Sequence, residues 1–330
     1  MASTLLYFGQ FSLRVSVTES ATHFGVMRVA ITGATGYVGQ SLVQKLLRRD
    51  HEVRALARHP ESAGTLRDLG VHVVAGAVTE PDAVRSLLEG ADAVVHLAGI
   101  IAESGRQTFE SVHVGGTQVV VDVAGHAAVP LVLHMSALGA RASAPTRYHR
   151  TKWQAEEIVR ASGRPHVIFR PSLIAGPGNA PLKMMVDMIR FSPVVPVIGD
   201  GRYEMQPVWL GDVTEAFALA LERADLRGTF DLGGPERLSY HRMLDHLEAA
   251  LGVHRRRISI PVGVARFAAA AGTALPNAAP ITTEQLLLLL EGNTTAESAI
   301  ESRFGLSPRP FAQVAQEICA PFAARPAAAS

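Results

Sequence analysis

Three glycines spaced three residues apart constrain the fold of this chain more than any other feature. Gly33, Gly36 and Gly39 lie in ITGATGYVGQ, residues 31–40, after the short apolar run MRVAI and before LVQKLLRRD. A strand, a tight glycine turn and a helix form the phosphate-binding corner of a dinucleotide fold. The first glycine makes the turn, the second lets the backbone approach the pyrophosphate, and the third lets helix and strand pack closely.

The helix that follows the glycines has free N–H groups and a partial positive charge at its start, which favours phosphate. Because a strand precedes this loop and further strand–helix units follow it, we predict a dinucleotide site rather than a purely structural turn. The residues expected to contact the cofactor in this loop are Gly33, Thr35, Gly36, Tyr37, Val38 and Gly39.

Short apolar runs alternate with helical patterns from residue 28 onward. Strands buried on both faces and separated by helices indicate a parallel, doubly wound sheet. The expected strands are 28–32, 52–57, 71–74, 93–98, 131–136 and 166–169. The expected helices between them are 38–49, 81–89, 107–128 and 147–161.

After residue 170 the pattern loosens into a proline-punctuated stretch, and helical patterns resume at 212–224, 239–251, 262–274, 282–291 and 310–318. We predict an α/β fold: a Rossmann-type doubly wound parallel sheet at 27–175 and a smaller C-terminal α/β lobe at 176–330. The second half also returns a strand or two to the main sheet. Residues 1–26 are expected to be an N-terminal extension, either disordered or preceding the true start.

Composition narrows the function classes. The net charge is +1, which argues against a protein whose main role is to bind nucleic acid. The single cysteine, Cys319, excludes an internal disulfide and a cysteine-based zinc cluster, so we predict a reducing compartment and no metal site. No signal peptide is recognisable at the start. We expect a cytoplasmic location, with peripheral attachment to the inner membrane as the alternative.

Two later segments have a composition of their own. The basic run 254–257 is predicted to be a solvated loop rather than a phosphate-binding patch. The apolar stretch 260–280 comes closest to a membrane span, but Arg266 and prolines interrupt it, so we predict no transmembrane helix.

The end of the second strand bears on the choice of dinucleotide. A carboxylate there would hold the adenosine ribose hydroxyls and repel a 2′-phosphate, but the sequence reads Ala57-Arg58-His59. Arg58 can form charge-assisted hydrogen bonds to a 2′-phosphate, although a surface arginine is the alternative in this arginine-rich chain. We therefore expect NADP(H) in preference to NAD(H).

Tyr148 and Lys152 lie four residues apart on a predicted helix, so they share one face. An ammonium beside a phenol favours the phenolate, so we expect Lys152 to lower the pKa of Tyr148 toward the working range. Ser136 ends the fifth strand at the sheet edge where cofactors bind. It could hydrogen-bond a substrate carbonyl while Tyr148 donates a proton. Together the three residues predict a catalytic set, although a serine capping a loop is the alternative for Ser136 alone.

The glycine loop, Ser136 and the Tyr148-x-x-x-Lys152 motif resemble the short-chain dehydrogenase/reductase superfamily, in its extended or atypical branch. The likeness continues in FRPSLIAGPGN, GDGRYEMQPVWLGDV and FDLGGPERLSY, and it covers nearly the whole chain from Met27 onward. Within the superfamily, HMSALGA, YHRTKWQAEE and TTEQLLLLLEGN are most similar to the nucleotide-binding accessory subunit of respiratory complex I and its bacterial relatives.

The resemblance implies further site residues. It implies that Ala98 and Gly99 lie near the cofactor and that the segment carrying Arg170, Pro171 and Leu173 lies near the nicotinamide. It also implies that Asp212 opens a helix as its N-cap. Two positions depart from the family: Ala77 replaces an aspartate that contacts adenine, and His113 replaces an asparagine tied to proton relay. His113 either substitutes for that asparagine or packs a helix.

Two functions from different classes remain open at this point. The first is an NADP-dependent reductase, dehydrogenase or epimerase acting on a carbonyl or hydroxyl of a small molecule. The apolar side chains after residue 176 suggest a lipophilic ligand, although core packing explains them equally well; these are Met184, Met185, Met188, Phe191, Tyr203 and Trp209. The second is a non-catalytic accessory or sensor protein that docks on a respiratory complex. The substrate and the oligomeric state do not follow from the sequence.

Overall fold

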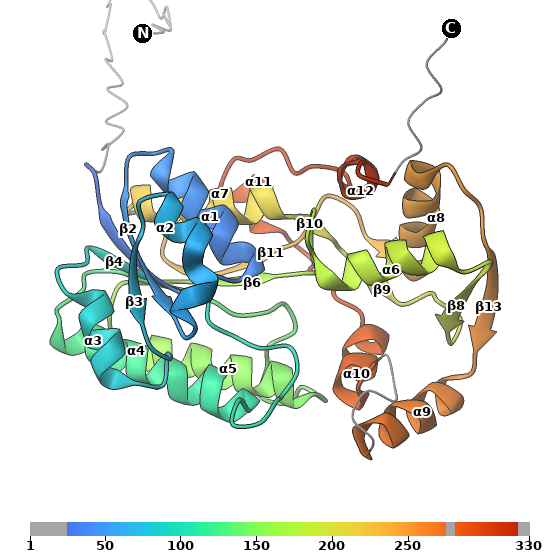
Figure 1. Cartoon of the computed structure of the whole chain (residues 1–330), viewed down its shortest axis with the longest axis horizontal. Helices are drawn as coiled ribbons and strands as arrows, with labels where there is room; N and C mark the ends of the chain where they lie inside the picture. Colours follow the sequence, from blue (N-terminus) through green and yellow to red (C-terminus); the bar gives the residue numbers. More distant parts are fainter. Residues whose placement is uncertain (1–24, 275–280, 323–330) are drawn as a thin grey trace, which may run out of the picture.

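The computed structural model describes residues 25–274 and 281–322 (Figure 1), so the expected extension at 1–26 lies almost entirely outside the described residues. Seven parallel strands form the central sheet, in the order β11-β6-β5-β4-β1-β2-β3. They are β1 (Arg28–Thr32), β2 (Glu52–Ala57), β3 (His72–Ala75), β4 (Ala93–His96), β5 (Val132–Met135), β6 (His166–Pro171) and β11 (Gly228–Leu232). The predicted doubly wound fold is confirmed.

Helices cover both faces of this sheet (Figure 1). One face carries α1 (Tyr37–Leu47), α2 (Gly64–Asp68), α7 (Leu210–Glu222) and α11 (Ala299–Ser302); the other carries α3 (Pro81–Leu88), α4 (Gly116–His126) and α5 (Arg147–Ala161). The strands are apolar on both sides for this reason. Along β1, Val29 and Ile31 belong to the apolar core between the sheet and α1. Ala30 belongs to the core on the opposite face, between the sheet and α3 and α4. A 3-10 helix, Pro60–Ala63, precedes α2, and a π-helical segment, Glu110–Gly115, precedes α4.

The second half of the chain contributes to both parts of the molecule. Strand β11 extends the main sheet by pairing with β6, and α7 packs on α1. The Glu215 carboxylate of α7 accepts a hydrogen bond from Lys45 Nζ at 2.6 Å and pairs with Arg49. The helix that follows the glycine loop is therefore held in place by a segment far away in the sequence.

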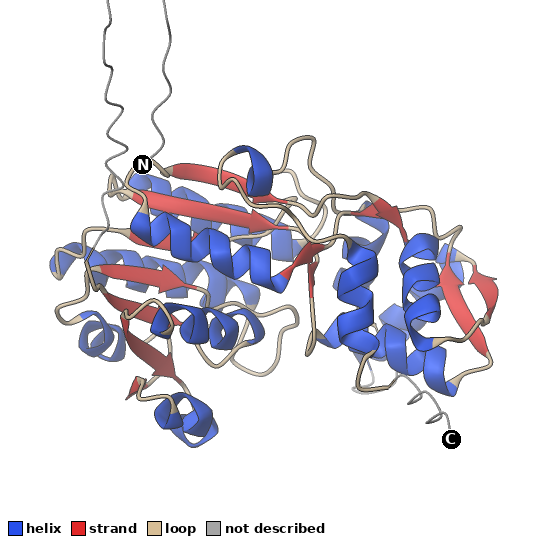
Figure 2. Ribbon diagram, turned by 90° about the horizontal axis from the view of Figure 1, so that it is seen from above, coloured by secondary structure: helices blue, strands red, loops and turns tan. Residues whose placement is uncertain are grey.

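The smaller lobe lies beyond the carboxyl ends of the strands (Figure 2). It contains α6 (Ala180–Phe191), α8 (Tyr240–Leu251) and α12 (Phe311–Cys319), which enclose a second apolar core. Three short strand pairs complete it: β7 (Ile174–Ala175) with β10 (Val208–Trp209), β8 (Val194–Ile198) with β13 (Arg256–Ile260), and β9 (Glu204–Met205) with β12 (Leu238–Ser239). Helices α9 (Val262–Ala274) and α10 (Thr283–Glu291) form a pair at one end of the lobe (Figure 1).

The order of the strands reverses between β1 and β4. Ligands of open α/β sheets bind at such a switch point, outside the carboxyl ends of the strands. The glycine loop leaves β1 at this edge, and Ala98 and Gly99 follow β4 at the same edge. The fold therefore brings two predicted cofactor segments together.

Gly39 sets how closely α1 approaches the loop before it. A Cβ atom at Gly39 would lie 2.2 Å from the Gly33 carbonyl oxygen and 2.6 Å from Ala34 Cα. Both contacts are with backbone, so the helix would have to move. We predict that Gly39→Ala lowers the free energy of unfolding by about 1–3 kcal/mol, measured by urea denaturation, and weakens nucleotide binding.

Gly64→Ala is the matched control for this variant. Gly64 begins α2 with a helical φ of −52°, and a Cβ there would meet no atom within 4 Å. Gly64→Ala should leave nucleotide binding unchanged and raise the free energy of unfolding by up to about 1 kcal/mol, because alanine loses less backbone entropy on folding. Equal stability of the two variants would show that α1 does not depend on the missing side chain.

Candidate active site

The glycine loop has the geometry of a phosphate cradle. Gly33 has a φ of +76°, and a Cβ there would lie 2.8 Å from the Ala98 backbone nitrogen. Gly36 closes the turn by donating its N–H to the Gly33 carbonyl at 3.0 Å, and it precedes α1 without a side-chain cap. The first N–H groups of α1 are therefore not satisfied by a capping side chain, which is the arrangement that receives an anionic group.

Lys152 lies beside the segment that follows β4. A Cβ at Gly99 would come within 3.0 Å of Lys152 Nζ, so the missing side chain lets the ammonium approach the backbone there. Lys152 is buried, and its Nζ donates a hydrogen bond to the Met135 carbonyl at 3.0 Å. This bond fastens α5 to the last residue of β5, next to Ser136.

Ser136 is buried, and its hydroxyl has no hydrogen-bond partner. Its backbone N–H donates to the Phe169 carbonyl at 2.7 Å, which fixes the residue at the end of the sheet. A buried hydroxyl without a partner is costly, so such a group usually has a ligand to bind. The loop after Ser136 then packs on α5: Gly139 has a φ of +95°, and a Cβ there would lie 3.0 Å from the His149 ring.

Tyr148 stands in the first turn of α5, one turn before Lys152. No residue in the described part of the chain hydrogen-bonds to its hydroxyl. Burial raises the pKa of Tyr148 to about 12. The expected lowering by Lys152 is therefore absent: Lys152 is bonded to Met135, and burial lowers the pKa of Lys152 itself to about 8. Tyr148 consequently keeps its proton at neutral pH, which suits a proton donor.

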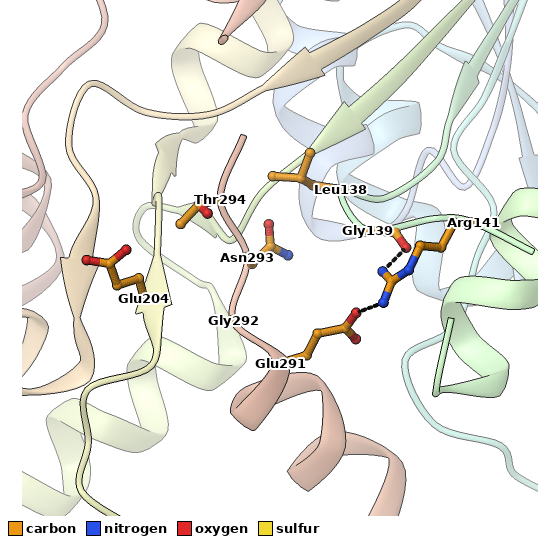
Figure 3. Close-up of a pocket in the computed structure, with 8 residues that line it drawn as sticks. All are labelled: Leu138, Gly139, Arg141, Glu204, Glu291, Gly292, Asn293 and Thr294. Carbon is orange, nitrogen blue, oxygen red and sulfur yellow. Dashed lines mark hydrogen bonds and ion pairs between the residues drawn. The ribbon is translucent and has the colours of Figure 1, made fainter. Parts of the chain in front are cut away.

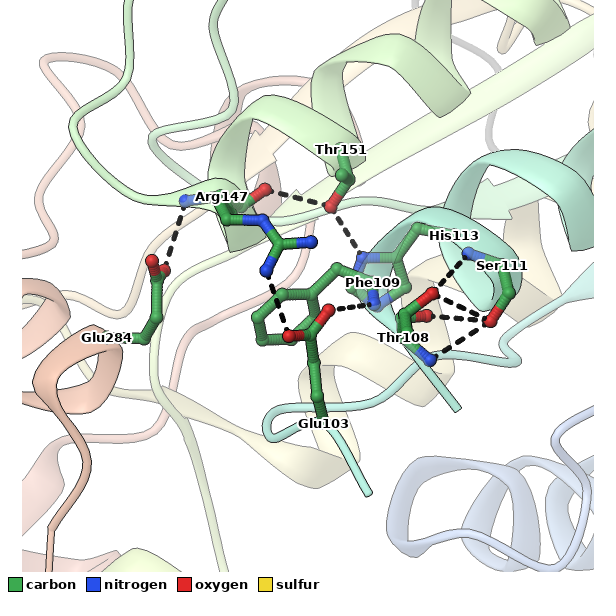
Figure 4. A network of polar contacts seen from close by, with 8 residues as sticks. All are labelled: Glu103, Thr108, Phe109, Ser111, His113, Arg147, Thr151 and Glu284. Carbon is green, nitrogen blue, oxygen red and sulfur yellow. Dashed lines mark hydrogen bonds and ion pairs between the residues drawn. The ribbon is translucent and has the colours of Figure 1, made fainter. Parts of the chain in front are cut away.

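Contacts with two glutamate carboxylates fix Arg147 at the start of α5 (Figure 4). Arg147 donates its backbone N–H to Glu284 of α10 at 3.0 Å, and its guanidinium pairs with Glu103 at 2.9 Å. Glu103 also accepts the Phe109 N–H at 2.8 Å. The loop after β4, the start of α5 and the start of α10 are thus tied together. Sequence reasoning missed this network because its members are far apart in the chain.

His113 lies in the π-helical segment, and its ring points toward Thr151 of α5 (Figure 4). Its Nε2 is 3.1 Å from both the N–H and the carbonyl of Ile100, and its Nδ1 is 3.0 Å from Thr151 Oγ1. Its ring meets the Tyr148 ring edge-on, with centroids 5.5 Å apart. Burial lowers the pKa of His113 to about 2, so the imidazole is neutral and acts through hydrogen bonds and packing.

Two further buried histidines lie in the neighbouring strands β4 and β5. His96 lies between Thr32 Oγ1 at 2.6 Å and Thr117 Oγ1 at 3.0 Å, and burial lowers its pKa to about 3. His134 packs on His96 with ring centroids 5.2 Å apart, and both its ring nitrogens lack partners. Burial also lowers the pKa of His134. Within residues 25–274 and 281–322, no group of three or more metal-ligating side chains is arranged to hold a metal.

A pocket of about 350 Å³ opens where the core meets the smaller lobe (Figure 3). The Arg141 guanidinium pairs with Glu291, and the Glu291 carboxylate is 3.4 Å from His149 Nδ1. The Asn293 Oδ1 is buried without a partner. The lining residues are Leu138, Gly139, Arg141, Glu204, Glu291, Gly292, Asn293 and Thr294. None of these residues was named from the sequence; three follow Ser136, and the others come from the lobe at 176–330, where substrate specificity was expected.

The other predicted cofactor residues differ in how their side chains lie. Arg58 is exposed after β2, and no described residue pairs with it. The Arg170 guanidinium is bound by buried Glu156 of α5 at 2.6 and 2.7 Å, so it is not free to contact a cofactor. The Tyr37 ring turns toward Gly176, where a Cβ would lie 2.8 Å from the phenol oxygen.

The backbone of the remaining segment lies at the sheet edge. The Pro171 carbonyl accepts the Leu138 N–H at 3.0 Å, and the Leu173 carbonyl accepts the Val208 N–H at 2.9 Å. Thr35 and Val38 lie in the glycine loop and the first turn of α1, where Val38 is buried. At Ala77, where a family aspartate is missing, the backbone N–H donates to Glu80 Oε2 at 3.2 Å.

The expectation that Asp212 is an N-cap is wrong, and of the two alternatives for the apolar residues after 176, core packing describes most of them. Asp212 is not an N-cap: α7 begins at Leu210 after Trp209, and Asp212 Oδ2 accepts the Arg309 N–H at 3.1 Å. The apolar residues after 176 do not line the pocket. Met185 is in the core of the lobe, while Met184 and Phe191 are exposed. Met188, Tyr203 and Trp209 also pack against that core.

Residues 33–186 match the family model described as NAD(P)H-binding. The match covers a little under half of the chain, and this segment is similar to NAD(P)H-binding domains. The predicted resemblance is confirmed, and a nicotinamide dinucleotide is the cofactor that the glycine loop and the switch point accommodate. No helix of the described residues is long and apolar enough to span a bilayer.

Curated relatives include reductases and a respiratory subunit. The chain is 35% identical to a ceramide reductase of Caulobacter vibrioides over 170 residues, 52% of this chain and 53% of that protein. It is 27% identical to the NADH dehydrogenase [ubiquinone] 1 alpha subcomplex subunit 9 of Arabidopsis thaliana over 258 residues, 76% of this chain and 64% of that subunit. It is 29% identical to a farnesyl-dihydroquinoline-oxide ketoreductase of Stigmatella aurantiaca over 270 residues, 76% of this chain and 80% of that enzyme.

Solved structures share the fold at low sequence identity. A UDP-glucuronic acid 4-epimerase from Bacillus cereus, in complex with UDP-glucuronic acid and NAD, superposes with a TM-score of 0.69 and 19% identity. The match covers 88% of this chain and 97% of that one. This similarity shows the fold over 88% of the chain, which takes in the main sheet and the smaller lobe.

The buried histidines make the fold sensitive to acid. Below pH ~6.5 the unfolded chain binds protons that the folded state, with its lowered histidine pKa values, does not bind. Stability is therefore retained above pH ~6.5 and lost as the pH falls. In the variant His134→Leu the unfolded chain binds up to one proton fewer. We predict that the decrease of the free energy of unfolding with falling pH becomes smaller by up to about 1.4 kcal/mol per pH unit. Urea denaturation at pH 7, 6 and 5 measures it.

His72→Leu is the control, because His72 is exposed on β3. It should leave the pH dependence as it is in the unaltered protein. Identical slopes for His134→Leu and the unaltered protein would show that His134 does not contribute to acid sensitivity.

Proposed function

We propose that this protein is an NADPH-dependent oxidoreductase that reduces a carbonyl group of a small lipophilic molecule to an alcohol, or catalyses the reverse reaction. The observation that carries the proposal is the Ser136 hydroxyl, buried without a partner at the carboxyl end of β5. The Lys152–Met135 hydrogen bond holds it beside α5, which also carries Tyr148.

The three side chains have distinct tasks in this reaction. The reduced nicotinamide supplies a hydride to the carbonyl carbon when bound. Ser136 Oγ–H donates a hydrogen bond to the carbonyl oxygen, and Tyr148 transfers its phenolic proton to that oxygen as negative charge develops. Lys152 positions the other groups: its Nζ donates a hydrogen bond to the Met135 carbonyl and so holds the end of β5, next to Ser136, against α5. Because its pKa is raised, Tyr148 is protonated at neutral pH, which is the state from which it donates a proton in the direction of reduction.

The lipophilic substrate class rests on the relatives, and the pocket suits a polar group on such a substrate. Two relatives have names that describe reductases of a ceramide and of a farnesyl-bearing quinoline oxide. The pocket wall carries oxygen acceptors, Asn293 Oδ1 and the Glu204 carboxylate, which suit hydroxyl or N–H groups of a substrate. A carbonyl compound with a polar, hydrogen-bond-donating end and an apolar chain fits these constraints.

The proton donor can be tested directly. We predict that Tyr148→Phe lowers kcat by about 10²–10⁴-fold, because the phenolic proton is lost while the ring contacts remain. Turnover is measured as NADPH oxidation over a panel of long-chain ketones and 3-oxo amides, and NADPH binding by fluorescence titration. Binding should be unchanged.

Tyr203→Phe is the matched control, since the Tyr203 hydroxyl is also buried without a partner but belongs to the smaller lobe. It should retain full turnover. Unchanged kcat in Tyr148→Phe would remove Tyr148 as proton donor and with it the proposed mechanism.

The cofactor preference depends on Arg58. We predict that Arg58→Ser weakens NADPH binding by about ten- to hundredfold and leaves NADH binding unchanged, because only NADPH carries the 2′-phosphate that the guanidinium binds. Arg48→Ser is the control: Arg48 is also exposed, but it caps the opposite end of α1. Equal affinities for NADPH in the unaltered protein and Arg58→Ser would contradict the proposed preference.

A second candidate function is that of a non-catalytic subunit that binds nucleotide as a structural part of a respiratory complex. The similarity to the Arabidopsis subunit and the replacement of a family asparagine by His113 favour it. Exchange of the nucleotide in natively purified protein distinguishes the two. Rapid exchange with labelled NADPH supports the enzyme, whereas nucleotide that does not exchange supports the structural role.

A further inference from the structure

Helix α9 exposes its large apolar side chains to solvent and buries its small ones. The side chains buried against the lobe are small: Ala265 is 7% exposed and Ala269 is 1% exposed. The larger ones point outward: Phe267 is 78% exposed and Val264 is 58% exposed. A helix on the surface of a water-soluble lobe normally buries its large apolar residues, so this face is suited to an apolar environment.

Strand β13 continues the same surface. Alternate residues of a strand share a face, so Arg256, Ile258 and Ile260 point to one side of β13. Ile260 packs against the cluster of Ala265 and Leu286 that joins α9 to α10, so the end of β13 lies next to α9. Ile258 is 52% exposed beside it. We call this set the α9 surface: Arg256, Ile258, Val264, Arg266 and Phe267.

The charge of the α9 surface is of one sign. The sequence has no aspartate or glutamate between Glu248 and Glu284. Arg256 and Arg266 are exposed, and neither has a partner in the described part of the chain. By contrast, neighbouring Arg257 is held by Asp245 at 2.6 Å. Exposed apolar side chains flanked by unpaired arginines are the composition of an element that lies on an anionic lipid surface.

We propose that the α9 surface binds an anionic phospholipid bilayer and thereby brings the pocket to its substrate. The pocket lies at the far end of α10, where Glu291 lines it, and α10 packs on α9 through Leu286. The delivery of substrate rests on the proposed function, in which the substrate is a lipophilic carbonyl compound. Binding to the bilayer does not, because it needs neither nucleotide nor turnover.

The full chain is tested by cosedimentation with vesicles of phosphatidylcholine alone or with 30% phosphatidylglycerol, without nucleotide. The protein should sediment with the anionic vesicles and remain in the supernatant with the neutral ones. Raising the salt concentration should release it, because screening weakens the attraction to the headgroups. Failure to sediment with anionic vesicles overturns the proposal.

The apolar part is tested by the double variant Val264→Ser/Phe267→Ser, which should lower the partition constant about tenfold or more. Met184→Ser/Phe191→Ser is the matched control, because these residues are 53% and 76% exposed on α6, which lies apart from α9 in Figure 1. The control should bind vesicles normally. An equal loss in both variants would place the lipid contact elsewhere and overturn the assignment.

The charged part is tested by Arg256→Gln and Arg266→Gln, each of which should weaken binding about fivefold. Sedimentation velocity tests whether a second copy of the chain covers the α9 surface instead of lipid. The proposal is overturned if the protein is a dimer that Val264→Ser/Phe267→Ser converts to monomer and if no vesicle binding is seen. NADPH titration and thermal unfolding confirm that each variant is folded. Vesicle binding without any reductase activity would leave the α9 surface in place and remove the proposed function alone.

Discussion

The absence of a side chain at Gly33 is the constraint on which the site depends. Any Cβ there would meet the Ala98 backbone nitrogen at 2.8 Å, so only glycine lets the loop after β1 and the segment after β4 approach each other. Their approach forms the switch point of the sheet, and it leaves the first N–H groups of α1 aimed at the edge where Ser136 and Gly99 also lie. Gly99 acts in the same way, because the absence of a side chain there lets Lys152 Nζ approach the backbone.

The chemistry of the site is set by burial more than by charge pairing. Tyr148, Lys152 and His113 all have pKa values shifted toward the neutral form, and burial is the largest cause for each. A nicotinamide site that excludes water strengthens every hydrogen bond made by a carbonyl oxygen inside it. The same burial keeps the histidines neutral, and the fold therefore loses stability as the pH falls.

Much of the core could be predicted because its elements carry complete local signals. The boundaries 28–32, 52–57 and 147–161 agree with β1, β2 and α5. Helix α6 was missed because Pro181, taken as a breaker, stands in its first turn, where the missing N–H costs nothing. The helix expected at 107–128 is divided, because the segment Glu110–Gly115 is π-helical. The basic run 254–257 was expected to be a loop, yet its second half begins strand β13.

The sequence by itself determined the parallel α/β core, the glycine loop and the spacing that puts Tyr148 and Lys152 on one face, because each depends on residues close together in the chain. Tertiary structure alone decided the rest. In the folded chain, Arg170 is bound to Glu156 and Lys152 donates to the Met135 carbonyl. Burial raises the pKa of Tyr148 instead of lowering it. Tertiary structure also assembled the pocket from separate segments, since contacts between them depend on packing that no local pattern encodes.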